Sequence, residues 1–577
     1  MTRTDSVVVG TLVVLFALIA GLVGLPALAP AVSPGQSAGF TPGSPVARPY
    51  REGVLGHPDS VSPLTARTQA DRDLVALVFA GLVRNGPSGT IVADLAERWS
   101  SDASGTTWTF ELRDDARWHD GEPVTAEDVV FTIRTLQDPA YIGPAAGSWN
   151  EVEVRAASPR TVVFTLRTAL AGFLQAATQP IAPAHLLADV PAASLGVDPF
   201  GRKPVGAGPF ALVSLGTDRV ELVPAVTIMP NIGPSALPSA GPDSFATAAP
   251  TERPSRPTPY LPAMEFRYFD TPSALAAAYR AGDLDAASGL SPALTAELAS
   301  AKGSRLVRYP GSTLTAVLLN LRPGRPEFAD PAVRTALLAA IDRAALIDRA
   351  FAMTAGAASG LIPPSSTLFD PAADPWVRYD RAAARTALKK AGWTVSPAGW
   401  FLPKARKPLS IELISPDEAS NPAAFAAAAA VAQDWKKLGL GVTHVPLPPG
   451  EFVTDRLATG TFSAAVADVN VGLDPDLYPL LASSQTLRGG SNVIGLQDPT
   501  LDVLLVAARG PGPADARATV YARLQRQLAK GRYLLPLAFA DESIVVRDTL
   551  QGMVVRQVSD PADRFWDVLT WRLAADR

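Results

Sequence analysis

The chain has 577 residues, of which 47% are hydrophobic and 18% charged, and its formal net charge is −4. A single hydrophobic core stops growing at roughly 250 to 300 residues, so this length predicts two or more lobes. The charge balance lacks the basic excess of a nucleic-acid binder. The sequence contains no cysteine, which excludes a disulfide framework, a thiolate zinc site, an iron–sulfur cluster and a cysteine nucleophile.

The N-terminal region carries a long apolar segment. No charged residue occurs between Asp5 and Arg48, and residues 7–25 are almost wholly apolar. A span of about 20 such residues matches the hydrocarbon core of a bilayer. Small residues follow it at the spacing of a signal-peptide cleavage site, so 1–30 is predicted to be a membrane anchor or a signal peptide. A helix buried in a lobe is the alternative. Residues 31–49, rich in Pro, Gly, Ser and Ala, predict a flexible linker.

Residues 91–136 predict a strand, a turn and a helix in succession. From 106 to 112, large apolar residues alternate with polar ones, which is the period of a half-buried strand. An Asp-Gly pair at 120–121 is a turn signal. Thr125, followed three residues later by Asp128, marks a helix start before an apolar run.

This stretch also contains short sequence strings that resemble those of a known protein family. The strings L-A-E-x-W, W-T-F-x-L-R and A-R-W-H-D-G-x-P-V-T-A-E-D-V-V-F-T closely resemble the segment shared by extracytoplasmic solute-binding proteins of the oligopeptide, dipeptide and nickel type, family 5, which feed ABC importers. The resemblance covers about 50–554, without a Pro-rich insertion. It implies an α/β, periplasmic-binding-protein-like two-lobed fold of the large type, with an extra subdomain in lobe 1. The lipid-modified cysteine of many relatives is missing.

The resemblance also implies how the chain divides. Lobe 1 begins at 50–66, is interrupted by the inserted subdomain at 67–203, and continues at 204–270 with the Pro-rich insertion 224–262. Lobe 2 follows at 271–510, and 511–577 returns to lobe 1.

Strands and helices alternate along most of the remaining chain, which supports an α/β fold. Thr271-Pro272 and Asp330-Pro331 each combine a capping residue with a first-turn proline, the favoured order at a helix start. The other predicted helices lie at 68–84, 183–187, 380–392, 421–438 and 514–528. Predicted strands lie at 152–154, 161–166, 409–414, 441–447 and 534–540.

Catalytic motifs are missing from the sequence. It has no H-E-x-x-H helix, no phosphate-binding G-x-x-x-x-G-K and no G-x-S-x-G. Its four histidines are far apart along the chain, at 57, 119, 185 and 444. Paired carboxylates occur at turns and helix starts, where they suit the helix dipole. The chain is therefore predicted to be no enzyme, to hold no metal and to need no cofactor.

The segment 462–480 is the best candidate for ligand binding. Relatives place a strand edge here, followed by acidic residues, one of which can pair with the amino terminus of a peptide. In this chain Asp474 matches the later part of that pattern, but the position three residues earlier is Val471. Asp468 or Asn470 is expected to replace the missing carboxylate. The alternative for Asp474 is that it caps the following helix.

Other ligand-binding candidates come from matching positions in the family. Asp59, Ser60 and Val61 lie where relatives carry a strand that ends in a turn, and Asn320 lies in a family-like Leu-Asn-Leu string. Trp149 follows a Gly-Ser pair and is the best of the tryptophans for a place in a cleft, although most large aromatic residues belong to cores. Arg322 could meet an acidic group, but a solvated arginine is the simpler interpretation.

Together these features predict a protein that captures a peptide or similar small solute between two lobes and delivers it to an ABC permease with its ATPase. Ligand contacts to both lobes would favour the closed form. The protein is expected to be a monomer outside the cytoplasm, held at the membrane by its N-terminal segment, with no nucleic-acid partner. An anchored sensor or peptide chaperone with the same fold is the alternative, and an exported hydrolase is a weaker one.

Overall fold

The computed structural model describes residues 48–144, 149–227, 258–290, 292–352, 354–403, 405–486 and 490–574. The predicted anchor or signal segment, nearly all of the linker and most of the Pro-rich insertion lie outside these ranges. Within them, no helix is both long and apolar enough to cross a membrane.

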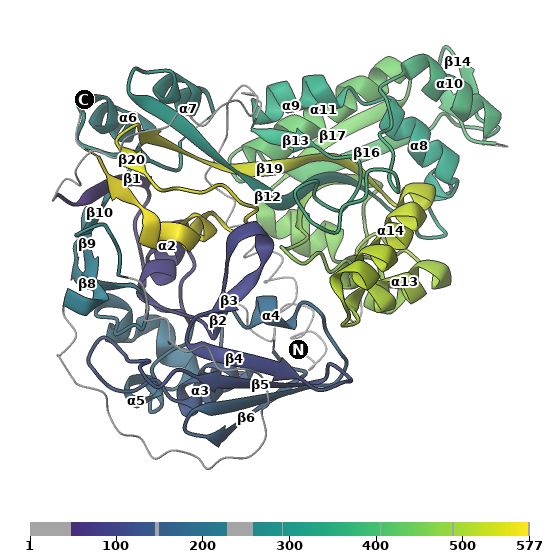
Figure 1. The fold of residues 1–577 in the computed structure, drawn as a ribbon. Coiled ribbons are helices and arrows are strands. Elements are labelled where there is room, and N and C mark those ends of the chain that lie inside the picture. The colour runs from purple at the N-terminus through teal and green to yellow at the C-terminus, as the bar shows by residue number, and fades with distance from the viewer. Residues whose placement is uncertain are drawn as a thin grey trace.

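Two long antiparallel strands run through the centre of the molecule (Figure 1). They are β12 (Ser304–Leu319) and β19 (Leu534–Arg547), and their pairing extends from Ser304 opposite Arg547 to Leu318 opposite Leu534. They lie in the middle of one 11-stranded mixed sheet. The order of its strands is β17 (Gly441–Leu447), β16 (Ser410–Pro416), β18 (Ala464–Asn470), β12, β19, β11 (Ala286–Ala287), β1 (Tyr50–Leu55), β10 (Met264–Phe269), β9 (Arg219–Pro224) and β8 (Phe210–Leu215), and β13 (Ala355–Ala357) also pairs with β19.

The side chains of β12 and β19 enter four hydrophobic clusters. The start of β12 contributes Val307 to the largest cluster and packs Leu306 against a small one. In the second half of β12, alternate side chains enter two further clusters. Val317 and Leu319 belong to one cluster, and Leu314, Ala316 and Leu318 belong to the other. β19 likewise contributes residues to all four. The same pair of strands therefore supports the cores of both lobes.

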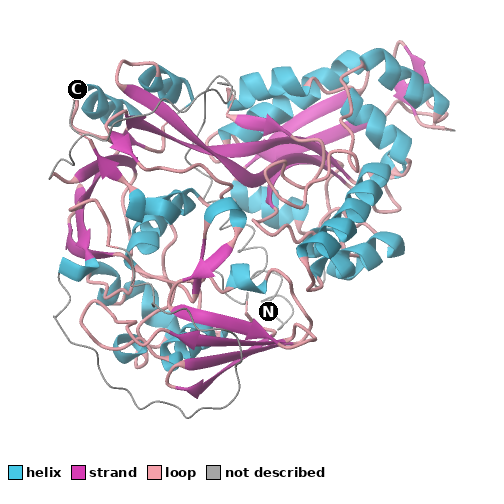
Figure 2. Ribbon diagram, in the orientation of Figure 1, coloured by secondary structure: helices cyan, strands magenta, loops and turns pink. Residues whose placement is uncertain are grey.

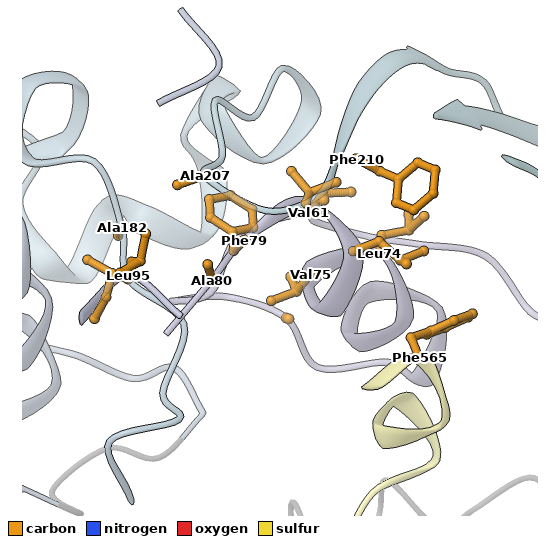
Figure 3. Packing of buried hydrophobic residues seen from close by; sticks show 14 of the residues in the cluster. Val61, Leu74, Val75, Phe79, Ala80, Leu95, Ala182, Ala207, Phe210 and Phe565 are labelled. Atoms are coloured by element: carbon orange, nitrogen blue, oxygen red, sulfur yellow. The ribbon is translucent and has the colours of Figure 1, made fainter. Parts of the chain in front are cut away.

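The first lobe packs α2 (Gln69–Val78) and η8 (Pro561–Thr570) on the sheet (Figure 1). Figure 3 shows Leu74 of α2 close to Val61, Phe210 and Phe565, which come from distant parts of the sequence, while Val75 lies on the other side of the helix. A second pair of helices, α6 (Pro272–Ala281) and α7 (Pro292–Ala299), joins the small cluster with Val545 of β19.

The inserted subdomain has its own four-stranded antiparallel sheet, apart from the long strands (Figure 2). Its order is β4 (Ala96–Ser101), β5 (Thr107–Leu112), β7 (Thr161–Leu166) and β6 (Val152–Ser158), with α3 (Ala126–Gln137), α4 (Phe173–Ala176) and α5 (Ala184–Leu187) beside it. The strand predicted at 106–112 and the helix start at Thr125 are confirmed. The amide of Thr125 donates to the Asp128 carboxylate at 2.8 Å.

The second lobe covers both faces of its part of the sheet with helices (Figures 1 and 2). One cluster contains residues of α8 (Pro331–Ala339), α9 (Arg343–Phe351), α10 (Arg381–Lys390) and α11 (Pro422–Leu438). The other contains residues of α12 (Tyr478–Leu481), α13 (Pro499–Arg509) and α14 (Ala514–Gly531). Short hairpins are formed by β2 (Val83–Asn85) with β3 (Ile91–Ala93), β14 (Thr394–Ser396) with β15 (Gly399–Phe401), and β20 (Leu550–Gln551) with β21 (Arg572–Leu573).

Two predicted helices differ from the structure. The helix predicted over 68–84 ends at Val78, because tertiary packing straightens the chain there. A side chain on Gly81 would place its Cβ 2.6 Å from the Thr178 carbonyl oxygen. The helix predicted after Asp330 is two helices, α8 and α9. α6 and α7 share a cluster with Val545 of β19, and α14 shares a cluster with α12 and α13.

A buried ion cluster joins the C-terminal part of the chain to its beginning. Arg564 of η8 donates to both carboxylate oxygens of Asp73 at 2.7 and 2.6 Å and to Glu52 of β1 at 2.8 Å. Tyr50 donates to the other oxygen of Glu52 at 2.8 Å. Burial raises the pKa of Asp73, although Arg564 opposes the shift. One guanidinium therefore serves two carboxylates that are withdrawn from water.

Replacement of Arg564 tests this dependence. Arg564→Met should lower the free energy of unfolding by about 3 to 5 kcal/mol at pH 7, because it leaves two buried carboxylates without a cation. Urea denaturation followed by circular dichroism measures the change. The control is Arg98→Met, which removes an exposed pair with Glu111 at 2.6 Å and should cost no more than about 1 kcal/mol. Equal losses in the two variants would contradict the role given to Arg564.

Candidate functional site between the lobes

The two lobes meet at an irregularity in the central strand pair. Between Pro310 and Leu314 of β12 the register shifts, so that 311–313 lie opposite Ala540 alone. A Cβ on Gly311 would collide with the carbonyl oxygen of Ala540. Only glycine allows the two backbones to approach this closely. We call residues 310–314 and 540 the joint.

Hydrogen bonds from both lobes converge on the joint. The amide of Val558 donates to the Pro310 carbonyl at 2.9 Å, and the amide of Val471 donates to the Ser312 carbonyl at 3.1 Å. Asn470, at the end of β18, accepts from the Ser312 hydroxyl at 2.8 Å and donates to the Ser559 carbonyl at 3.0 Å. The amide side chain of Asn470 therefore ties the second lobe to the segment before η8.

A second contact joins the inserted subdomain to the second lobe. The amide of Ala171 donates to the Arg509 carbonyl at 2.7 Å. A Cβ on Gly172 would lie 3.3 Å from a carboxylate oxygen of Asp474, and a Cβ on Gly105 would lie 2.6 Å from Cγ of Pro511. This contact brings together two subdomain loops and the region around the end of α13.

Arginine partners hold the acidic residues of this contact. Arg517 donates to Asp474 at 2.6 Å, and Arg509 lies 3.0 Å from Asp476. The amide of Tyr478 donates to Asp476 at 3.0 Å, at the start of α12. The interpretation of Asp474 as the cap of that helix is wrong, because the N-cap residue of α12 is Leu477 and the helix has no side-chain cap.

Asp468 occupies a different environment in the second lobe. Its half-buried carboxylate accepts from the Thr315 hydroxyl at 2.5 Å and from the Asn421 side-chain amide at 2.7 Å. Both donors are neutral, and burial raises the pKa of Asp468. Asn421 also caps α11 by accepting from Ala424, so Asp468 helps to orient a helix start.

Asp59, Ser60 and Val61 form a tightly held turn. The amides of Asp59 and Ser60 both donate to the Asp71 carboxylate, at 2.7 and 2.9 Å, and the amide of Val61 donates to the Gly201 carbonyl at 2.9 Å. The side chain of Asp59 is exposed, whereas Val61 is fully buried in the first-lobe core (Figure 3).

The other candidates from the sequence are packed inside the protein. Trp149 is buried among Phe164 and Phe173 of the subdomain, with ring centroids 6.0 Å from each. Asn320 is buried and donates to two carbonyl oxygens of the loop before β18. Arg322 donates to the Val493 carbonyl at 2.9 Å and to Asn320 at 3.1 Å, and is not the solvated arginine expected from the sequence. The structure therefore does not bring these residues together with Asn470 and Asp474.

One titratable group beside the joint carried no signal in the sequence. Glu542 of β19 is half-buried directly opposite Tyr309 of β12. Burial, with smaller contributions from Asp560 and Asp541, raises the pKa of Glu542 to about 7. The raised pKa of Glu542 could not be predicted from its strand, because the residues that bury it come from segments far away in the sequence.

Across the ranges covered by the structure, no group of three or more histidine, aspartate or glutamate side chains could hold a metal ion. The fold and the two contacts define a two-lobed α/β binding protein with an inserted subdomain.

Comparisons with known proteins identify the family. Residues 90–490 match the model for bacterial extracellular solute-binding proteins, family 5. The chain belongs to this family and is therefore a solute-binding protein.

Two curated relatives span most of the chain. Protein XP55 of Streptomyces lividans is 29% identical over 516 residues, covering 87% of this chain and 86% of that protein. The oligopeptide-binding protein AppA of Bacillus subtilis is 23% identical over 530 residues, covering 90% of this chain and 91% of AppA. Among solved structures, HbpA2 of Haemophilus parasuis matches with a TM-score of 0.74 at 20% identity, covering 92% of this chain and all of that one. At that identity the likeness shows the fold alone.

The pKa of Glu542 predicts a pH dependence of stability. Between its ordinary value of 4.5 and about 7, the folded protein keeps a proton that the unfolded chain has already released. Stability from this group is therefore complete below pH 4.5 and is lost as the pH rises through 7. The free energy of unfolding of Glu542→Gln minus that of the parent should therefore be about 1 to 3 kcal/mol larger at pH 8 than at pH 4.5.

Urea denaturation at the two pH values measures this difference. Glu153→Gln, at an exposed position of β6, is the matched control and should shift stability by the same amount at both. A Glu542→Gln variant whose difference from the parent is the same at pH 4.5 and pH 8 would contradict the assignment.

Proposed function

We propose that the chain captures a small, peptide-like solute between its two lobes outside the cytoplasm and passes it to an ABC permease with its ATPase. Membership of the family supports solute binding. The peptide-like class rests on relatives such as AppA, whose name describes an oligopeptide-binding protein. The N-terminal apolar segment would export the protein or anchor it to the membrane, and the protein would act as a monomer.

One observation carries the placement of the solute between the lobes. The segment 470–474 of the second lobe meets the first lobe through Asn470 at the joint and meets the subdomain through Asp474. A solute that lies along this segment would therefore touch both lobes. A solute with different affinity for the open and closed forms can then shift the balance between them.

The same contacts suggest where the lobes divide. We place the division at the joint, so that the second lobe extends from about 311 to 540 and the subdomain remains 67–203. This boundary assigns α6 and α7 to the first lobe and α14 to the second, in agreement with their clusters.

The candidate residues then have different roles. Asp474 is balanced by Arg517, so its carboxylate is a poorer partner for a peptide ammonium than the resemblance implies. Asn470 lies at the lobe boundary and Asp59 and Ser60 form a turn of the first lobe, while Val61, Trp149 and Asn320 are buried and would act through packing. Asp468 positions α11.

Native mass spectrometry of the purified protein tests the proposed function. Protein prepared without a denaturing step should carry an additional mass of one small solute, which is lost when the protein is unfolded and refolded. The closed form holds such a solute because both lobes contact it. An enzymatic conversion of the released solute by the intact protein would contradict the proposal, as would a bare chain that binds no member of a mixed peptide hydrolysate.

A further inference from the structure

The contact between the subdomain and the second lobe is built for reversible closure. Its polar part includes a backbone hydrogen bond from Ala171 to Arg509. A hydrogen bond of this kind contributes only about 0.5 to 1.5 kcal/mol net, because both groups bind water when they separate. Beside it, the two sides approach closely at Gly172 and Gly105. Such a contact can open without unfolding either side.

The second-lobe side of the contact is held rigid. Asp474 is fixed by Arg517 of α14, and the guanidinium of Arg517 lies 5.6 Å from the ring centroid of Tyr521. Tyr521 in turn donates to the Pro475 carbonyl at 2.6 Å. The Asp474 carboxylate therefore faces Gly172 in a fixed orientation. It loses little conformational freedom when the subdomain and the second lobe come into contact.

Gly172 has no conformational need to be glycine. Its φ of −75° and ψ of 7° are open to any residue. A small residue is favoured at this position because Asp474 lies close by, and a Cβ on Gly172 would be 3.3 Å from its carboxylate oxygen. A substitution at Gly172 therefore changes the contact and leaves the backbone unstrained.

The contact lies at the far end of a short segment from the joint. Asn470 is bonded at the joint, and Asp474 meets the subdomain four residues later. Four residues span at most about 14 Å when fully extended, and the positive φ of 75° at Gly472 bends this segment and shortens it. The subdomain loops reach the second lobe at the ends of α13 and α14, away from the crossing of β12 and β19 (Figure 1).

We propose that Gly172, Ala171, Asp474 and Arg509 form a latch that closes the space between the lobes on the side away from the joint. When the latch is closed, a solute beside 470–474 is enclosed at both ends and is no longer than about 14 Å, or about four extended residues. The size limit rests on the proposed function, whereas the latch itself does not.

A disulfide across the latch provides the test. A Cβ on Gly172 would lie 3.7 Å from Cβ of Asp474, within the range of about 3.5 to 4.5 Å that a disulfide requires. The chain has no cysteine of its own, so the double variant Gly172→Cys/Asp474→Cys can form only this bond internally. In the folded protein it should oxidise at least about tenfold faster than a pair held apart. Non-reducing electrophoresis measures the rate.

A matched control separates the latch from general flexibility. Gly196 lies in the same subdomain, and a Cβ there would have nothing within 4 Å. The pair Gly196→Cys/Asp474→Cys should therefore oxidise slowly. Equal rates in the two pairs, or no internal disulfide in the first, would overturn the latch.

The same variant tests what the latch encloses. In native mass spectra, the oxidised Gly172→Cys/Asp474→Cys protein should keep its co-purified solute through dialysis, and the reduced protein should release it. Equal release in both forms would overturn the enclosing role, and a retained peptide much longer than four residues would overturn the size limit. A fast disulfide in a protein that carries no solute in either state would support the latch and count against the proposed function alone.

Discussion

The pairing of β12 with β19 is the constraint on which the rest of the structure depends. The two strands supply residues to all four hydrophobic clusters, so neither lobe can form its core without them. Their ladder continues on both sides of the joint but shifts register between Pro310 and Leu314. Pairing on each side resists separation of the lobes, while the irregular stretch, with a second register shift between Thr315 and Ala316, is where a change of backbone angles costs least. A single chain can thus hold two bodies together and still leave them an axis of rotation.

Charge is handled differently in the two lobes. The first lobe buries Asp73 and Glu52 around Arg564 and links the beginning of the chain to its end. The second lobe balances Asp474 with Arg517 but leaves Asp468 to neutral donors. Near the joint, Glu542 keeps its proton up to about pH 7. Of Asp468, Asp474 and Glu542, only Asp474 has a cationic partner within the described part of the chain, so in the proposed function a solute would be recognised by shape and hydrogen bonds as much as by charge.

The sequence predicts the parts of the fold that local patterns determine. β5 follows from the alternation of Trp108 and Phe110, and α11 from Asn421-Pro422 at its start and Gly439 in the left-handed conformation at its end. The joint could not be predicted, because Pro310 and Gly311 argue against a strand and the partner strand lies more than two hundred residues away. The site shares this difficulty. Whether Asp474 is free, caps a helix or pairs with Arg517 depends on where α14 packs, and the position of Trp149 depends on Phe164 of β7 and Phe173 of α4.

The central claim is that the lobes move as units about the joint. Spin labels can be placed specifically in this cysteine-free chain at exposed positions, with Val197→Cys in the subdomain and Val506→Cys in α13. Pulsed electron paramagnetic resonance then measures the distance between them before and after the solute is removed. Removal should lengthen this distance, while the distance between Val197→Cys and Val213→Cys, both in the first lobe, stays the same. An unchanged distance across the lobes, or an equal change within one lobe, would contradict the account.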